Sequence, residues 1–168
     1  MAVVTVKSTT IANRDAVPSV INDGRLERGS LRSTHGYVSA TNGDSVNSKY
    51  VLASVPSTVM VRKVLLSCDA ITTCAGDIGV YRNTKDGGAA VSAALFGSAV
   101  SLATALSNSD VTNESGNYTL AKQEQPLWQA AGLSADPGGT LDIAVTLTAA
   151  AASGGSVGMA VEYVDNGT

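Results

Sequence analysis

The run GGSVG at residues 154–158 has the spacing of a hydrolase nucleophile motif, with Ser156 in the position of the nucleophile. In that motif a strand enters the turn, a helix leaves it, and a histidine later in the chain removes the serine proton. Here a strand-like run follows the serine, and the chain's one histidine, His35, lies 121 residues earlier. The run is better interpreted as a flexible hairpin loop, and His35 as a histidine on a sheet face or surface.

The sequence also contains no pattern that indicates a metal site or a cofactor site. Cys68 and Cys74 are the two cysteines of the chain, and with a single histidine they do not complete a zinc site. Buried structural thiols are the favoured interpretation, and a disulfide is the alternative. Asp77 and Asp142 fall on the edges or wet faces of expected strands, where solvated carboxylates are ordinary. No phosphate loop, dinucleotide fingerprint or calcium loop occurs. We therefore expect no catalytic, cofactor-binding or metal-binding residues, and no enzyme.

The clearest architectural pattern lies in residues 140–164, where apolar and polar residues alternate in two runs. The apolar positions that share a face are Leu141, Ile143, Val145 and Leu147 in the first run and Val157, Met159, Val161 and Tyr163 in the second. Alternation of this kind marks strands buried on one side. A DPGG turn at 136–139 precedes the first run, and an SGGS loop at 153–156 separates the two. We expect a closing antiparallel hairpin.

Further strands are expected upstream, at residues 33–41, 49–55, 58–68 and 77–83. The run 58–68 is apolar on both faces, which indicates a covered strand, with Arg62 and Lys63 breaking the pattern near its middle. The spacing of apolar residues predicts a helix over 91–106 and a short strand over 118–122. One or two helical turns are expected over 125–133, with Trp128 packed on an open end of the sheets. The fold class is all-β: an antiparallel β-sandwich of jelly-roll type with one or two short helices.

Composition narrows the class of function. Charged residues make up 15% of the chain, against about 25% in an average globular protein, and aromatic residues 4%. So few charges suit a surface that neighbouring molecules cover in part. The net charge of −3 argues against a dedicated nucleic-acid binder. No secretory signal and no apolar run long enough to span a membrane is present. We expect neither nucleic acid nor membrane as a partner.

Residues 1–31 lack sustained periodicity and are expected to form an extended N-terminal arm, with the sandwich domain over residues 32–168. Residues 1–32 hold five basic and three acidic side chains, a local charge of +2, which leaves six basic and eleven acidic side chains, a charge of −5, in the rest. We expect a neighbouring subunit to order this arm, through Arg14, Arg25, Arg28 and Arg32 facing acidic or carbonyl groups. A solvated tail is the alternative.

Two stretches of the chain resemble small structural proteins of tailed bacteriophages that decorate or cement the head. These are DIGVYRNTKDGGAAVSAALFGSAVSLATAL (77–106) and QPLWQAAGLSADPGGTLDIAVTLTAAAASGGSVGMAVEYV (125–164), within a likeness that covers residues 50–165. The resemblance implies a jelly-roll domain on the outside of an icosahedral shell, with the major capsid protein as its partner. It also implies a homo-oligomer, dimer or trimer, that is made in the host cytoplasm and ends on the capsid surface of the virion.

The leading hypothesis is therefore a capsid cement or decoration protein. A β-sandwich binding module of a phage tail or fibre that recognises host glycans is the alternative, although few aromatic residues are available as sugar platforms. A hydrolase that uses Ser156 is the third and least favoured reading.

Overall fold

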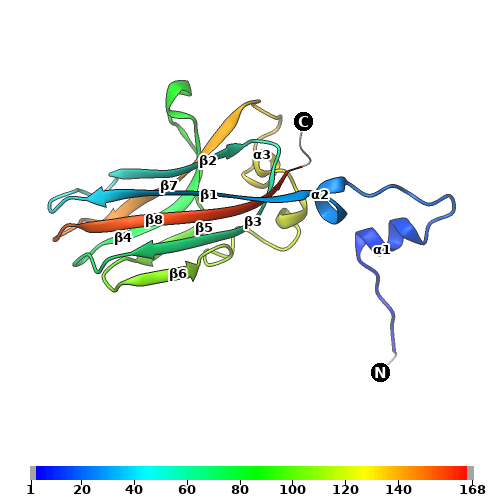
Figure 1. Ribbon diagram of the computed structural model, residues 1–168, viewed down its shortest axis with the longest axis horizontal. Coiled ribbons are helices and arrows are strands. Elements are labelled where there is room, and N and C mark those ends of the chain that lie inside the picture. The colour runs from blue at the N-terminus through cyan, green and yellow to red at the C-terminus, as the bar shows by residue number, and fades with distance from the viewer. Residues whose placement is uncertain (1–2, 166–168) are drawn as a thin grey trace.

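The computed structural model describes residues 3–165, and its largest part is a sandwich of two antiparallel sheets of four strands each (Figure 1). The strands are β1 (Ser30–Ala40), β2 (Lys49–Pro56), β3 (Met60–Cys68), β4 (Ala75–Arg82), β5 (Ala90–Ser101), β6 (Leu106–Asp110), β7 (Thr140–Ala149) and β8 (Gly155–Asp165). The first sheet has the order β1-β8-β3-β6 and the second the order β2-β7-β4-β5. Eight strands distributed over two sheets in this order form a jelly roll, so the predicted fold class is confirmed.

The predicted apolar faces of β7 and β8 lie against the core, but the hairpin predicted from these strands is wrong. The wet face predicted for β7 is also wrong near its start, because Asp142 and Ala144 are buried there. Leu141, Ile143, Val157 and Val161 are all fully buried. However, β7 belongs to the second sheet and β8 to the first, so residues 150–154 cross between the sheets instead of turning back within one. The pattern of a strand shows which face is buried and does not identify the strand beside it. Both apolar faces meet the same core, from opposite sides.

The helix predicted over residues 91–106 is wrong, because residues 90–101 form β5 and residues 106–110 form β6. The pairing of β5 with β4 shifts register at three places. Such irregularities interrupt the two-residue alternation of a strand. Leu95, Phe96 and Gly97 are consequently buried one after another, and the apolar spacing imitates that of a helix.

The strand predicted over residues 118–122 is also wrong. The segment turns into the short 3-10 helix η2 (Lys122–Glu124), and a second one, η1 (Thr84–Asp86), lies between β4 and β5. Tyr118 is buried in a different role: its ring stands edge-on to Phe96 with centroids 5.0 Å apart, and its hydroxyl donates to the Val61 carbonyl at 2.8 Å. The helical turn expected within 125–133 is confirmed as α3 (Leu127–Ala130).

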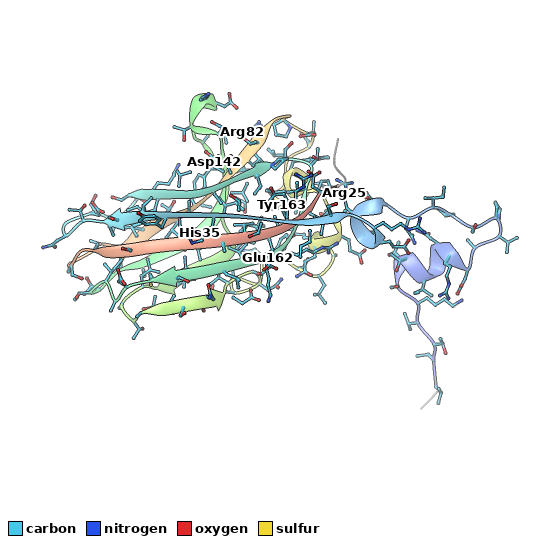
Figure 2. All side chains as sticks on the ribbon, viewed as in Figure 1. Arg25, His35, Arg82, Asp142, Glu162 and Tyr163 are labelled. Carbon is cyan, nitrogen blue, oxygen red and sulfur yellow. The ribbon has the colours of Figure 1, made fainter. Side chains whose placement is uncertain are left out.

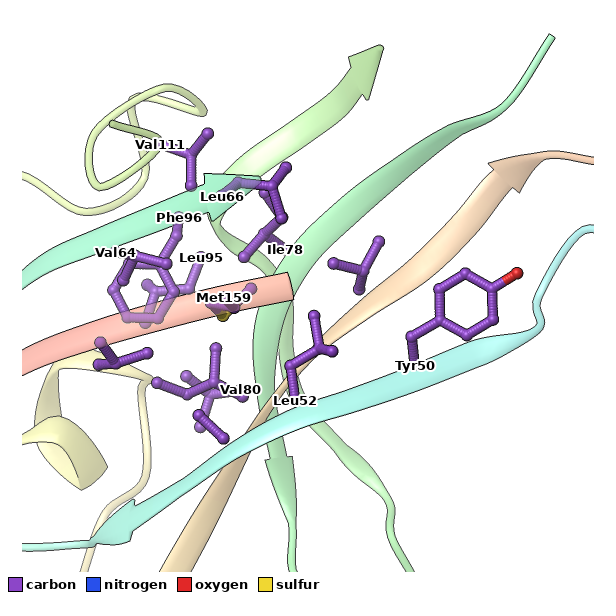
Figure 3. Close-up of a cluster of buried hydrophobic side chains, with 14 of the residues drawn as sticks. Tyr50, Leu52, Val64, Leu66, Ile78, Val80, Leu95, Phe96, Val111 and Met159 are labelled. Atoms are coloured by element: carbon purple, nitrogen blue, oxygen red, sulfur yellow. The ribbon is translucent and has the colours of Figure 1, made fainter. Parts of the chain in front are cut away.

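The core lies between the two sheets and is made of aliphatic side chains with few aromatic ones (Figure 3). Helix α3 covers one end of this core. Leu127 and Ala130 are buried there, and the Leu127 amide donates to the Val59 carbonyl at 2.8 Å. Trp128 packs half-buried against the same core, as predicted.

The N-terminal arm, residues 3–29 of the described chain, projects from the sandwich beside the start of β1 (Figure 1). It contains two helices that the sequence did not predict, α1 (Thr9–Arg14) and α2 (Gly24–Glu27). Strand β1 begins at Ser30, two residues before the expected start of the domain. No residue from 3 to 29 is buried, so the arm contributes nothing to the core of the sandwich.

Candidate partner-binding surfaces

The arm is attached to the sandwich by two arginines. Arg25, on α2, donates from its guanidinium to the Thr58 carbonyl at 2.5 Å and pairs with Asp23 at the same distance. Arg62, on β3, donates to the carbonyls of Arg25 at 3.0 Å and Gln123 at 3.1 Å. Figure 2 places Arg25 where the arm meets the sandwich. These bonds fix the root of the arm, the segment from Asp23 to Arg28.

Arg62 interrupts the apolar pattern of β3, and the sequence does not predict that it binds the arm. Its position coincides with a register shift in the pairing of β3 with β8, between Val61 and Lys63. A bulge of this kind redirects a side chain that would otherwise follow the alternation. The signal was present in the sequence as the charged pair that interrupts an otherwise apolar run. A covered strand that contains an arginine needs polar partners for it, and here these are main-chain carbonyls.

Asn22 holds the two halves of the arm together. Its side-chain amide accepts from Asn13 at 2.8 Å and donates to the Thr10 carbonyl at 3.2 Å and to Glu27 at 2.7 Å. The Val20 amide donates to the Asn13 carbonyl at 3.0 Å. Among the described residues, no hydrogen bond or ion pair joins residues 3–22 to the sandwich. The arm beyond its root is therefore organised by polar contacts within itself.

The four arginines predicted to contact a partner have different surroundings. Arg25 bonds within the chain, as described above. Arg14 is paired with Asp15 at 2.8 Å, and Arg32 lies 3.7 Å from Asp165, yet their side chains remain 65% and 55% exposed. Arg28 is exposed and its side chain makes no hydrogen bond or ion pair to residues 3–165. Arg14 and Arg28 line one hollow of about 630 Å³ together with Val20, Ile21 and Glu27.

Aliphatic side chains of the arm face solvent. Val3, Val17 and Ile21 are at least 95% exposed, and Val4 and Val6 are 74% and 86% exposed. Scattered apolar residues are normal on a protein surface, but a short segment with this many and no buried residue is a candidate for contact with another molecule.

A second hollow, of about 250 Å³, lies on the outer face of the first sheet. Tyr37 on β1 stands on one side of it, Leu106 on the other, and Gly158 on β8 lies between them. Tyr37 is 70% exposed. The carboxylate of Asp69, which accepts from the Ser156 amide at 2.7 Å, places a negative charge at the rim.

The serine and the histidine that could have supported hydrolysis are far apart. Ser156 lies opposite Ser39 at the start of β8, and His35 lies opposite Ala160. Four residues along a strand separate these positions, which is about 13 Å. A strand and not a helix follows Ser156, so the arrangement of a nucleophile elbow is not formed.

Cys68 and Cys74 are free, buried thiols, as predicted, and burial raises the pKa of each. Within residues 3–165 no group of three or more histidine, cysteine, aspartate or glutamate side chains is placed to hold a metal ion. No helix in that range is both long and apolar enough to cross a membrane.

Comparison with known proteins gives one likeness, in fold. No protein-family model and no curated protein matches the chain. Among solved structures, a chain described as "Cyanophage Pam1 capsid asymmetric unit" superposes with a TM-score of 0.51 at 18% sequence identity. The match covers 86% of this chain and 91% of that one. At this identity the likeness extends to the sandwich fold over nearly the whole of both chains.

Proposed function

We propose that this protein is a structural component of a phage head that binds the outside of an icosahedral shell and holds neighbouring major capsid subunits together. The observation that carries the proposal is the likeness in fold, over 91% of its length, to a chain of a phage capsid asymmetric unit. The jelly roll, the low charge density and the projecting arm fit a protein that acts by being covered. In this proposal it is made in the host cytoplasm, has no enzymatic activity and needs no cofactor.

Cementing requires no chemistry. A protein that binds the assembled shell and not free capsid subunits stabilises the assembled form by mass action. Exposed ion pairs contribute about 0–1 kcal/mol each, so single contacts of Arg14, Arg28 or Arg32 are weak. Several such contacts per copy, repeated over many copies, would resist the internal pressure of packaged DNA.

The test is to add purified protein to undecorated mature capsids and to measure bound copies per capsid by sedimentation. Saturable, stoichiometric binding and a higher temperature of capsid disruption are expected. A chain without residues 1–22 keeps the Arg25–Thr58 and Arg62 bonds and should stay folded while binding more weakly. Absence of binding to mature shells, with recovery of the protein from another part of the virion, would overturn the proposal.

Recognition of a host glycan by a tail or fibre module remains the second candidate, and Tyr37 is the observation in its favour. Sugar sites usually present exposed aromatic faces, and Tyr37 is exposed beside a hollow. The other six aromatic side chains favour it less, because Tyr50, Tyr81, Phe96 and Tyr118 are buried and Tyr163 and Trp128 half-buried. Glycan-array signals that the Tyr37→Ala variant loses would favour this candidate over the first.

A further inference from the structure

The arm has order without a core. Its two helices and the loop between them are held by the Asn22 side chain and by main-chain bonds, and no residue from 3 to 29 is buried. Fixing the backbone of each residue costs conformational entropy, which folded chains offset chiefly by burying apolar surface. A second molecule must supply that burial if the arm is to keep this shape.

The charges favour a second copy of this chain as that molecule. Residues 1–32 carry five basic and three acidic side chains, a charge of +2, and residues 33–168 carry six basic and eleven acidic ones, a charge of −5. The sandwich of one copy therefore attracts the arm of another. Like charges on two sandwiches oppose association without the arms, so the arm is the element that joins copies.

The hollow at Tyr37 has the chemistry to receive the first residues of the arm. It combines an exposed aromatic ring, the half-buried side chain of Leu106 and the carboxylate of Asp69 at its rim. Residues 3–7 of the arm, VVTVK, contain three exposed valines, and the ammonium of Lys7 pairs with Asp15 at 2.8 Å within the arm. Valine and threonine favour extended backbone, in which Val4 and Val6 share a face.

The arm is directed away from the hollow of its own sandwich. Arg25 and Arg62 fix its root beside Thr58, and Ser30 follows at the start of β1. Tyr37 lies seven residues further along β1, which is about 23 Å toward the other end of the strand. In Figure 1 the arm leads outward from the sandwich at the end where β1 begins.

We propose that residues 3–7 of one copy dock in the Tyr37–Gly158–Leu106 hollow of a second copy, so that neighbouring copies are linked by their arms. The docking places Val4 and Val6 against the ring of Tyr37 and the side chain of Leu106. The linkage does not depend on a capsid shell. The proposed linkage adds to the proposed function by naming a partner for the arm. It is tested by measurements on the protein alone, without capsid shells.

The test compares full-length variants by sedimentation velocity over a range of protein concentrations. Val4→Asp/Val6→Asp alters the arm at exposed positions. Gly158→Leu fills the hollow, and its Cβ fits because the nearest atom, the Tyr37 Cβ, would lie 3.4 Å away. Val46→Asp, at an exposed valine between β1 and β2, is the matched control. Circular dichroism and thermal melts check that each variant is folded.

We expect wild type and Val46→Asp to associate alike, and each of the other two variants to raise the dissociation constant on the order of 10- to 100-fold. An equimolar mixture of the arm variant and the hollow variant should form a species of two chains, because the intact arm of one meets the intact hollow of the other. A monomeric wild type, association of both variants like wild type, or a mixture that stays monomeric would each overturn the proposal. Binding to capsids is measured separately, so failure here leaves the cementing role to its own test.

Discussion

The guanidinium of Arg62 donates a hydrogen bond of 3.0 Å to the main-chain carbonyl of Arg25, joining a strand of the sandwich to the root of the arm. A second bond from the same guanidinium, to the Gln123 carbonyl at 3.1 Å, brings the loop before α3 to the same point. One side chain thus holds three segments that are distant in sequence.

Replacing Arg62 by alanine should loosen the arm at its root. Hydrogen bonds from charged groups contribute about 1.5–3 kcal/mol each, so we expect a loss of about 2 kcal/mol in the free energy of unfolding. Amide hydrogen exchange at residues 23–28 should be faster in the variant, because local opening of this segment no longer requires the Arg62 hydrogen bonds to break. Lys63→Ala, on the adjacent exposed residue of β3, is the control and should leave exchange there unchanged. Equal exchange in both variants would mean that Arg62 does not hold the root.

Tyr118→Phe should destabilise the sandwich although it keeps the ring. The Tyr118 hydroxyl donates to the main-chain carbonyl of Val61, which is fully buried. The variant removes this donor from the Val61 carbonyl. We expect a loss of about 1–2 kcal/mol, measured by urea unfolding. Tyr37→Phe removes a hydroxyl from an exposed ring and should change stability little. A cost at residue 37 as large as that at residue 118 would contradict the assignment.

Stability should fall in acid because three carboxylates each accept two hydrogen bonds. Tyr50 and the Thr41 amide donate to Asp44, the hydroxyl and amide of Thr112 to Asp110, and Ser57 and the Gly138 amide to Asp136. These bonds lower the pKa of each carboxyl below its ordinary value of 3.8. A carboxyl whose pKa is lower in the folded state than in the unfolded state binds its proton more readily when the chain is unfolded. Its contribution to the free energy of unfolding is therefore complete above the ordinary pKa, and it is lost as the pH falls through the pKa of the folded state.

Urea unfolding at a series of pH values checks this. The free energy of unfolding should be level above about pH 5 and decline below about pH 4. Asp110→Asn should flatten the decline, while Asp86→Asn, whose side chain accepts no hydrogen bond from residues 3–165, should not. A decline of the same slope in both variants would assign the acid sensitivity to other groups.

Both thiols should resist modification in the folded protein. Cys74 is 1% and Cys68 7% exposed, and burial raises the pKa of each, so neither supplies an accessible thiolate near neutral pH. Titration with an aromatic disulfide reagent should detect no fast-reacting thiol in native protein and both thiols in denaturant. Ala103→Cys, at an exposed loop position, should add one fast-reacting thiol. Rapid reaction of the unaltered native protein would show that the region around Cys68 opens readily.

The buried faces of the strands could be predicted from the sequence, but which strands lie side by side in a sheet could not. The apolar positions of β7 and β8 are buried as expected, apart from the half-buried Tyr163, because the two-residue period follows directly from strand geometry. Which sheet each strand joins depends on long-range pairing, and the alternation holds no information about it. The spacing in β5 resembles that of a helix because its register shifts put Leu95, Phe96 and Gly97 into the core in succession.

The candidate site shows the same division. Charge and the absence of periodicity predict that the N-terminal residues contact a partner, and Arg28 is exposed on this segment. Composition could not show that Arg25 bonds to Thr58, because that depends on where the turn between β2 and β3 lies in space. The hollow at Tyr37 depends on Gly158 of another strand lying opposite Tyr37, a register that only the paired strands reveal.

The position of β8 between β1 and β3 has a consequence for how the chain folds. Ser30 pairs with Asp165 and Ala40 with Gly155, so the first sheet joins the first and the eighth strand of the described chain. Strand β1 pairs with β8 in this sheet, and β3 lies between β6 and β8. The inner edge of β1 and one edge of β3 therefore have no partner until residues 155–165 are available. Folds dominated by such distant pairings acquire their structure slowly, on the scale of milliseconds to seconds. During synthesis these edges of β1 and β3 therefore stay exposed until β8 has been made and completes the sheet.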